Sequence, residues 1–161
     1  MPTIVRLASG SDMDSLLALN AEVQALHAEL HPEDFRPKAD VEGARAMFAA
    51  QLGRPDAEIA IAEVDGAAAG HVLFEILALA ESAFNPPRRR ADVHHLCVTK
   101  SMRRQGVATG LVRFVEQRGA EEGVAELALD VWTANAGAAK FFESLGFAPF
   151  KVVMRKRSPV G

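Results

Sequence analysis

The sequence predicts an α/β fold built on a mixed, mostly antiparallel sheet. Three observations lead to this prediction. Apolar residues recur at helical spacing over 11–30 and 106–121, as they do in helices with one buried face. Strand-like apolar runs mark 92–99 and 126–132. The pair Asp65-Gly66 separates two further apolar runs, which is a strong signal for a tight antiparallel hairpin.

The first half of the chain is expected to hold one strand, two helices and the hairpin. The predicted elements are a strand at 3–8, a helix from a cap at Ser11 to about Leu30, a helix at 41–52 ended by Gly53, and hairpin strands at 58–64 and 68–78. The first helix would bury one face that is made of aliphatic side chains, namely Leu16, Leu19, Val23, Leu26 and Leu30.

The second half is expected to alternate strands with helices. Pro86-Pro87 and the arginines at 88–90 are predicted to form a loop before the next strand. The remaining predicted elements are a strand at 92–99, a helix at 106–121, a strand at 126–132, a helix at 135–145 and a last strand near 149–156. Gly123 and Gly146 fit the ends of the two helices, where a left-handed residue often stops the turn.

Composition limits the class of protein. The 161 residues suit one domain, and 49% apolar with 24% charged residues is typical of a globular chain. The net charge of −3 argues against general nucleic-acid binding, and no apolar run is long enough to predict a membrane span. The N-terminus lacks the apolar core of a signal peptide, and a single cysteine suits a reducing compartment. A cytoplasmic location is therefore expected.

The most informative segment is Arg103-Arg104-Gln105-Gly106-Val107-Ala108, which links a strand-like run to a helix-like run. The first N–H groups of a helix have no partner within the helix, and the helix dipole makes that end partly positive. A phosphate or pyrophosphate can bind there, and Gly106 would allow close approach because it has no Cβ. Neither a Walker loop nor a dinucleotide fingerprint is present.

A second block covers 127–147. It reads as a strand, a turn that contains Asn135, and a short helix that ends in Leu145-Gly146-Phe147. Ala138, Phe141 and Phe142 share one side of that helix with Leu145.

Together the two blocks resemble the cofactor-binding motifs of the GCN5-related N-acetyltransferase (GNAT) family. The resemblance is specific over residues 91–147 and general elsewhere. It implies a single acetyltransferase domain over 1–161, with helices on both faces of the sheet. It also implies acetyl-CoA as co-substrate, no metal, and transfer of the acetyl group to a primary amine by direct attack in a ternary complex.

The resemblance carries over to cofactor-binding positions. Backbone N–H groups of 104–109 would hold the pyrophosphate, and the strand edge at 96–98 would pair with the pantetheine arm and direct one N–H at the thioester oxygen. Asn135 would bind the arm from the other side, or cap its helix, or do both. The implied set is Leu96, Cys97, Val98, Arg103, Arg104, Gln105, Gly106, Val107, Ala108, Thr109, Asn135, Ala138 and Phe142.

A general base is expected on the strand before the loop, where the family often has an acidic residue. His94 is preferred because imidazole accepts protons near neutral pH, with Asp92 and His95 next and Glu75 on the neighbouring strand as a fourth candidate. Strand alternation would place Asp92 and His94 on one face and His95 with Cys97 on the other. The alternative is that these residues only fill polar positions at a sheet edge.

Cys97 raises the possibility of a covalent acetyl carrier. The preferred interpretation is a small packed hydrophobic residue, which is the usual role of a lone cysteine in an apolar strand.

The chain departs from the family at the general acid. The family commonly has a tyrosine before the glutamate of the second block, whereas this chain has Phe142 and no tyrosine at all. The departing thiolate would then be protonated by water. His27, His31 and Phe35 are expected to line the acceptor cleft; the alternative is an ordinary surface loop.

Two other functions remain open at this point. One is a non-catalytic acyl-CoA-binding or sensory module of the same fold, which Phe142 favours. The other is a nucleotide-binding regulatory domain of a different fold. The expected partner is a small-molecule or peptide amine that the sequence does not identify, with no nucleic acid and no membrane, and a homodimer is possible.

Overall fold

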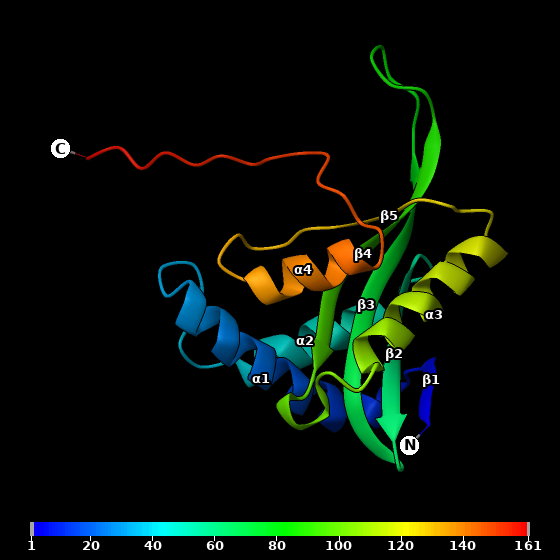
Figure 1. Ribbon diagram of the computed structural model, residues 1–161, viewed down its shortest axis with the longest axis vertical. Coiled ribbons are helices and arrows are strands. Elements are labelled where there is room, and N and C mark those ends of the chain that lie inside the picture. The colour runs from blue at the N-terminus through cyan, green and yellow to red at the C-terminus, as the bar shows by residue number, and fades with distance from the viewer. Residues whose placement is uncertain (1, 161) are drawn as a thin grey trace. The chain divides into compact units, whose positions relative to one another are not determined.

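A computed structural model of the protein describes residues 2–160 (Figure 1). The elements are β1 (Thr3–Leu7), a 3-10 turn (Gly10–Asp12), α1 (Met13–Leu30), α2 (Val41–Leu52), β2 (Ala57–Val64), β3 (Ala67–Leu79), β4 (Arg88–Val98), a second 3-10 turn (Lys100–Met102), α3 (Val107–Glu121), β5 (Leu127–Leu129) and α4 (Ala136–Ser144). They fall into two compact units, one ending at Asp130 and one beginning at Val131. The single domain expected from the sequence stays a prediction.

The sheet has the order β1-β2-β3-β4-β5. The first three pairs are antiparallel and β5 runs parallel to β4, which confirms the predicted mixed, mostly antiparallel α/β fold. The predicted turn joins β2 to β3, and Asp65 and Gly66 both have positive φ, at 51° and 77°. Positive φ at both central residues is the geometry that matches the twist of a two-residue hairpin.

Helices of the first unit cover both faces of the sheet. On one face, α3 packs Val107, Leu111 and Val115 onto inward residues of the central strands. On the other face, Leu16 of α1 and Phe48 of α2 form a separate cluster with β2 and β3. None of the helices within residues 2–160 has the combination of length and apolarity needed to cross a bilayer.

The strands β3 and β4 extend past their neighbours as a two-stranded ribbon (Figure 1). Their ladder continues to Leu79 opposite Arg88, whereas β2 stops pairing at Glu75 and β5 at Ala91. The prediction of a loop at 88–90 is therefore wrong. The three arginines belong to β4 because residues 77–79 supply a backbone partner for each of them.

The start of the first helix differs from the prediction. Ser11 does not cap it; the chain first makes the turn Gly10–Asp12, and the Ser9 N–H donates to Asp12 Oδ2 at 2.8 Å. Asp12 is fixed in turn by Arg6, whose guanidinium donates to Asp12 Oδ1 at 2.8 Å. The helix α1 therefore begins at Met13, two residues after Ser11, and the hydrogen bond from Arg6 lowers the pKa of Asp12 to about 2.

The last predicted strand is also wrong. Residues 147–160 form neither helix nor strand, although 149–156 carries alternating apolar residues. A strand needs a neighbouring ladder, and no described residue pairs with this segment. Similarly, β5 is shorter than the predicted 126–132 because it pairs only with Ala91–Val93 of β4.

Candidate functional site

A β-bulge in β4 shapes the candidate site. Leu73 pairs with His95 whereas the next residue, Phe74, pairs with Val93, so His94 is an extra residue without a ladder partner. The predicted alternation fails at this point. Asp92 lies opposite Glu75 and His95 lies opposite Leu73, so Asp92 and His95 share one face of the sheet. A bulge cannot be seen in an apolar pattern because it depends on the register with the neighbouring strand.

The bulge brings His94 to Glu75. His94 Nε2 lies 2.7 Å from Glu75 Oε2, a hydrogen bond between β4 and β3. The Glu75 side chain is only 13% exposed, whereas the His94 side chain is 42% exposed. This geometry pairs an accessible imidazole with a sheltered carboxylate, which is an arrangement that can orient a base.

Asp92 is engaged elsewhere. Arg90 Nη2 donates to Asp92 Oδ2 at 2.8 Å, and the two side chains are both mostly buried. This hydrogen bond is the main cause that raises the pKa of Arg90. The carboxylate of Asp92 is therefore held by Arg90 of the same strand.

His95 faces the first helix. Burial lowers its pKa, and the neighbouring His94 and His27 lower it further. Burial also lowers the pKa of His27, followed by an effect of His31. Both imidazoles are therefore neutral at pH 7, and the histidines of β4 and α1 lie within electrostatic reach of each other.

The three residues predicted to contact the acceptor are close together. Phe35 packs against both histidines, with ring centroids 4.7 Å from His27 and 6.4 Å from His31. The structure therefore brings one aromatic and two imidazole rings together on the helix α1 side, in the same electrostatic neighbourhood as His95.

Cys97 is not set up as a nucleophile. It is 4% exposed, and its thiol donates to the Leu19 carbonyl at 3.1 Å. Burial raises the pKa of Cys97 to about 12, with a further contribution from Glu22. A nucleophilic cysteine needs an accessible thiolate, and this one is a buried thiol.

The predicted anion loop is a turn over 103–106 that leads into α3. Its four residues are exposed, whereas Val107 at the helix start is 1% exposed and anchors it in the core. Gly106 precedes the helix with φ at 83°, and Arg104 also has a positive φ of 64°. The left-handed conformation at Gly106 directs the chain into the helix while leaving the approach to its first N–H groups open.

Contacts from α1 brace the approach to this loop. Glu22 accepts hydrogen bonds from Thr99 Oγ1 at 2.7 Å and from the Lys100 N–H at 3.0 Å. These bonds, the Thr99 bond first, lower the pKa of Glu22. Glu22 could not be found from the sequence, because 77 positions separate it from Thr99 and no local motif marks it.

The edge of β4 before the loop is not paired with β5. The parallel ladder ends at Val93, so 96–98 extends past it. Arg103 Nε donates to the Val98 carbonyl at 3.2 Å and folds the loop back onto this edge. A backbone edge of this kind can pair with an extended amide-containing ligand.

The remaining predicted cofactor residues lie in the second unit. Asn135 Oδ1 accepts from the Ala138 N–H at 3.2 Å, so its capping role is confirmed. Phe142 is 9% exposed and packs on Phe141 and Phe147, with ring centroids 5.1 and 5.5 Å away. Gly146 has φ at 91°, as expected for the residue that ends this helix.

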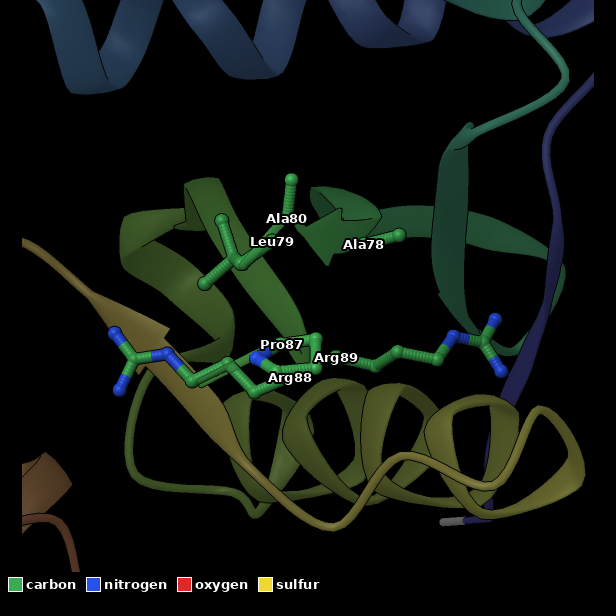
Figure 2. Close-up of a pocket in the computed structure, with 6 residues that line it drawn as sticks. All are labelled: Ala78, Leu79, Ala80, Pro87, Arg88 and Arg89. Carbon is green, nitrogen blue, oxygen red and sulfur yellow. The ribbon is translucent and has the colours of Figure 1, made fainter. Parts of the chain in front are cut away.

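A surface depression of about 360 Å³ lies on the β3–β4 ribbon (Figure 2). Its lining is Ala78, Leu79, Ala80, Pro87, Arg88 and Arg89, and no predicted site residue is among them. Arg88 and Arg89 extend in opposite directions, and the Arg89 side chain is bonded to the Glu122 carbonyl. The depression therefore offers apolar surface but no catalytic group.

Comparison with known proteins gives one family. Residues 21–147 match the acetyltransferase (GNAT) family. Human N-acetyltransferase 8 is 39% identical over 59 residues, which cover 37% of this chain but only 26% of that protein. An uncharacterized N-acetyltransferase from the pepI 3′ region of Lactobacillus delbrueckii subsp. lactis is 23% identical over 144 residues, with 88% of this chain and 82% of that protein covered.

Solved structures show the same fold. A tetramutant of the BH1408 protein from Bacillus halodurans superposes with a TM-score of 0.88 at 21% identity, covering 96% of this chain and 99% of its own. The aminoglycoside N-acetyltransferase AAC(6′)-Iy in complex with CoA superposes with a TM-score of 0.75 at 21% identity, covering 99% of this chain and 96% of its own.

Proposed function

The chain belongs to the acetyltransferase (GNAT) family, and from this premise we propose that it transfers the acetyl group of acetyl-CoA to a primary amine. The observation that carries the proposal is the sequence of features along β4. A histidine that is bonded to a carboxylate, an open strand edge and a glycine turn before a helix follow one another within residues 94–107. Acetyl transfer from acetyl-CoA requires a general base, a group that binds the thioester and a site that binds the pyrophosphate. These three features offer one candidate for each.

Acetyl-CoA would bind along this edge. The N–H groups of 104–109 would hold the pyrophosphate, with Gly106 allowing close approach. The pantetheine arm would pair with 96–98, and for this Arg103 would release the Val98 carbonyl. Among the solved relatives, AAC(6′)-Iy was crystallised with CoA, which supports the same cofactor here.

His94 would act as the general base. The neutral amine nitrogen attacks the thioester carbonyl carbon, a C–N bond forms, and the C–S bond breaks. His94 removes the proton that the amine nitrogen must lose, and the CoA thiolate takes a proton from water because Phe142 cannot donate one. One backbone N–H of 96–98 would stabilise the oxyanion, a contribution of roughly 10²-fold or more in rate.

The acceptor would enter between this strand and the first helix. His27, His31 and Phe35 would line that side, and the neutral imidazole of His27 would not repel a cationic amine. The name of AAC(6′)-Iy makes an aminoglycoside one candidate acceptor among other amines. A cytoplasmic location, a metal-free reaction, the lack of nucleic-acid and membrane partners, and a possible homodimer stay predictions.

The function is tested by release of free thiol from acetyl-CoA with a panel of amines. The panel should include aminoglycosides, polyamines, amino acids and lysine or N-terminal peptides. At least one amine should accelerate thiol release, and the His94→Ala variant should lose most of that acceleration. If no amine accelerates release above the rate of acetyl-CoA hydrolysis, the transferase proposal is wrong.

A second candidate is a non-catalytic acyl-CoA-binding or sensory module. Phe142 favours it, because the family's usual phenol is missing at this position. This alternative predicts that CoA raises the melting temperature while no amine accelerates thiol release. A nucleotide-binding domain of another fold is excluded by the family match.

A further inference from the structure

We propose that Arg54 is a positioning residue that fixes His94 for proton transfer by holding Glu75 in place. The inference rests on the acetyl transfer proposed above and adds a residue outside the strand and the loop. Arg54 follows the C-terminal end of α2, and its guanidinium forms an ion pair with Glu75 Oε1.

Arg54 is itself held in place. Its guanidinium donates to Asp56 Oδ1 at 3.1 Å and Oδ2 at 2.7 Å, and to Gln51 Oε1 at 3.2 Å. These bonds tie it to the end of α2 and to the start of β2. The Asp56 bond is the main cause that raises the pKa of Arg54. A planar group bonded to three partners has little freedom to rotate.

Glu75 divides its two oxygens between two partners. Oε1 forms an ion pair with Arg54, and Oε2 forms a hydrogen bond with His94 Nε2 at 2.7 Å. The side chain is 13% exposed, so little water competes for either oxygen. A carboxylate that is ion-paired to arginine only accepts hydrogen bonds. His94 Nε2 must then carry a proton, and Nδ1 keeps the lone pair.

The tautomer matters because a base needs a lone pair that faces its substrate. A neutral imidazole has two tautomers, and the hydrogen bond at one nitrogen selects between them. Without Arg54, Glu75 would be free to rotate about its side-chain torsions and release His94 Nε2. Two titratable groups of β4 lie on the same face as Glu75, namely Asp92, which is bonded to Arg90, and His95, which is neutral. Neither forms a hydrogen bond with His94 in the part of the chain that the structure describes, so Glu75 is the group that orients it.

The test compares Arg54→Gln with Arg54→Lys and with a matched control, Arg118→Gln. Arg118 makes a similar bridge, since its Nε donates to Glu58 Oε2 at 2.9 Å, but it lies on α3 against the other face. Loss of either bridge should lower the melting temperature by a similar amount. Only Arg54→Gln should change the tautomer of the His94 imidazole.

Two readouts separate positioning from general destabilisation. Long-range proton–nitrogen NMR of the imidazole should show the Nε2–H tautomer of His94 in the wild type and in Arg118→Gln, and a mixture in Arg54→Gln. With the best acceptor from the amine panel, Arg54→Gln should lower kcat about tenfold, less than the ~10²-fold loss expected without the base. Its KM for acetyl-CoA should not change, and Arg54→Lys should recover part of kcat.

The proposal is overturned if His94 in the wild type carries its proton on Nδ1, or if its tautomer is the same in Arg54→Gln. It is also overturned if Arg54→Gln and Arg118→Gln lose the same fraction of kcat. A wild-type chain that acetylates no amine refutes the proposed function instead, and the comparison of tautomers still decides whether Arg54 positions His94.

Discussion

The two faces of the sheet differ in kind. The α3 face is a continuous apolar core, in which Val72, Phe74, Leu111 and Val115 are fully buried together. The α1/α2 face has a smaller apolar cluster around Leu16 and Phe48, and beside it lie a buried histidine and a buried thiol. The α3 face stabilises the fold by apolar packing, whereas part of the α1/α2 face is occupied by polar groups.

His71 is the clearest sign of this difference. It is fully buried on β3, and neither ring nitrogen has a hydrogen-bond partner among the described residues. Its ring packs edge-on against Phe48 at 5.6 Å. Burial lowers the pKa of His71 to about 3, and His95 contributes further. The polar groups of the α1/α2 face therefore include His71 in the core and His95 at the candidate site, which lie within electrostatic range of each other.

The largest effect is expected on the α3 face. Leu111→Ala removes a side chain that is 0% exposed, and the cavity should lower the free energy of unfolding by about 3 kcal/mol. Urea unfolding measures this loss. The kcat of the folded variant should stay close to wild type, because Leu111 packs away from His94. A large fall in kcat without loss of stability would contradict the division between the faces.

The next effect is kinetic and belongs to the other face. His94→Ala should lower kcat/KM on the order of 10²-fold, as loss of a general base does. In the wild type kcat/KM should fall at acidic pH, because a protonated imidazole cannot accept the proton of the amine. No tyrosine is present to add an acid limb at high pH.

The control for this prediction is His95→Ala, which should cost less because no carboxylate among residues 2–160 is paired with His95 as Glu75 is with His94. If His94→Ala keeps wild-type kcat/KM between pH 6 and 8, the base is another group. His95 and Glu75 are then the next residues to replace.

A smaller effect concerns acid stability. Unfolded His71 binds a proton below about pH 6.5, whereas folded His71 does not until about pH 3. The unfolded state holds more protons in this window, so stability should fall as the pH drops through it, by up to about 1.4 kcal/mol per pH unit.

His71→Leu should remove this contribution and stay within about 1 kcal/mol of wild type at pH 7, since an unpaired polar group is replaced by an apolar one. Urea unfolding at pH 5 and pH 7 measures the change. An equal loss of stability on acidification in both proteins would show that His71 is not buried as a neutral ring.

The smallest effect is expected at Cys97. Cys97→Ala should retain most activity, because the thiol is buried and protonated. Intact mass after treatment with acetyl-CoA, without acceptor, should show no acetyl adduct. A stoichiometric adduct that disappears in Cys97→Ala would replace direct transfer with a covalent intermediate.

The features that the sequence predicted well are local ones. Asp65-Gly66, Gly106, Asn135 and Gly146 each determine the backbone within one turn, and their conformations agree with the prediction. The helix faces follow from short periodic patterns in the same way.

The features that were missed depend on contacts between distant segments. The bulge at His94 is set by the register with β3, and His94 and Glu75, 19 positions apart, are in contact there. Glu22, Arg54 and the arginines of the β3–β4 ribbon acquire their roles from partners on other elements. No residue pattern within a single window contains that information.

The central claim is that the loop at 103–108 binds the pyrophosphate of CoA, and thermal unfolding with and without CoA tests it most directly. At a free CoA concentration about 100 times the Kd, the free energy of unfolding of the wild type should gain roughly 2.7 kcal/mol. Gly106→Val should lose most of this gain. Gly123→Val is the matched control, because Gly123 also has positive φ, open surroundings and a place at an end of α3. It should keep the full CoA-dependent shift despite the same backbone strain. An undiminished shift in Gly106→Val would contradict the assigned site.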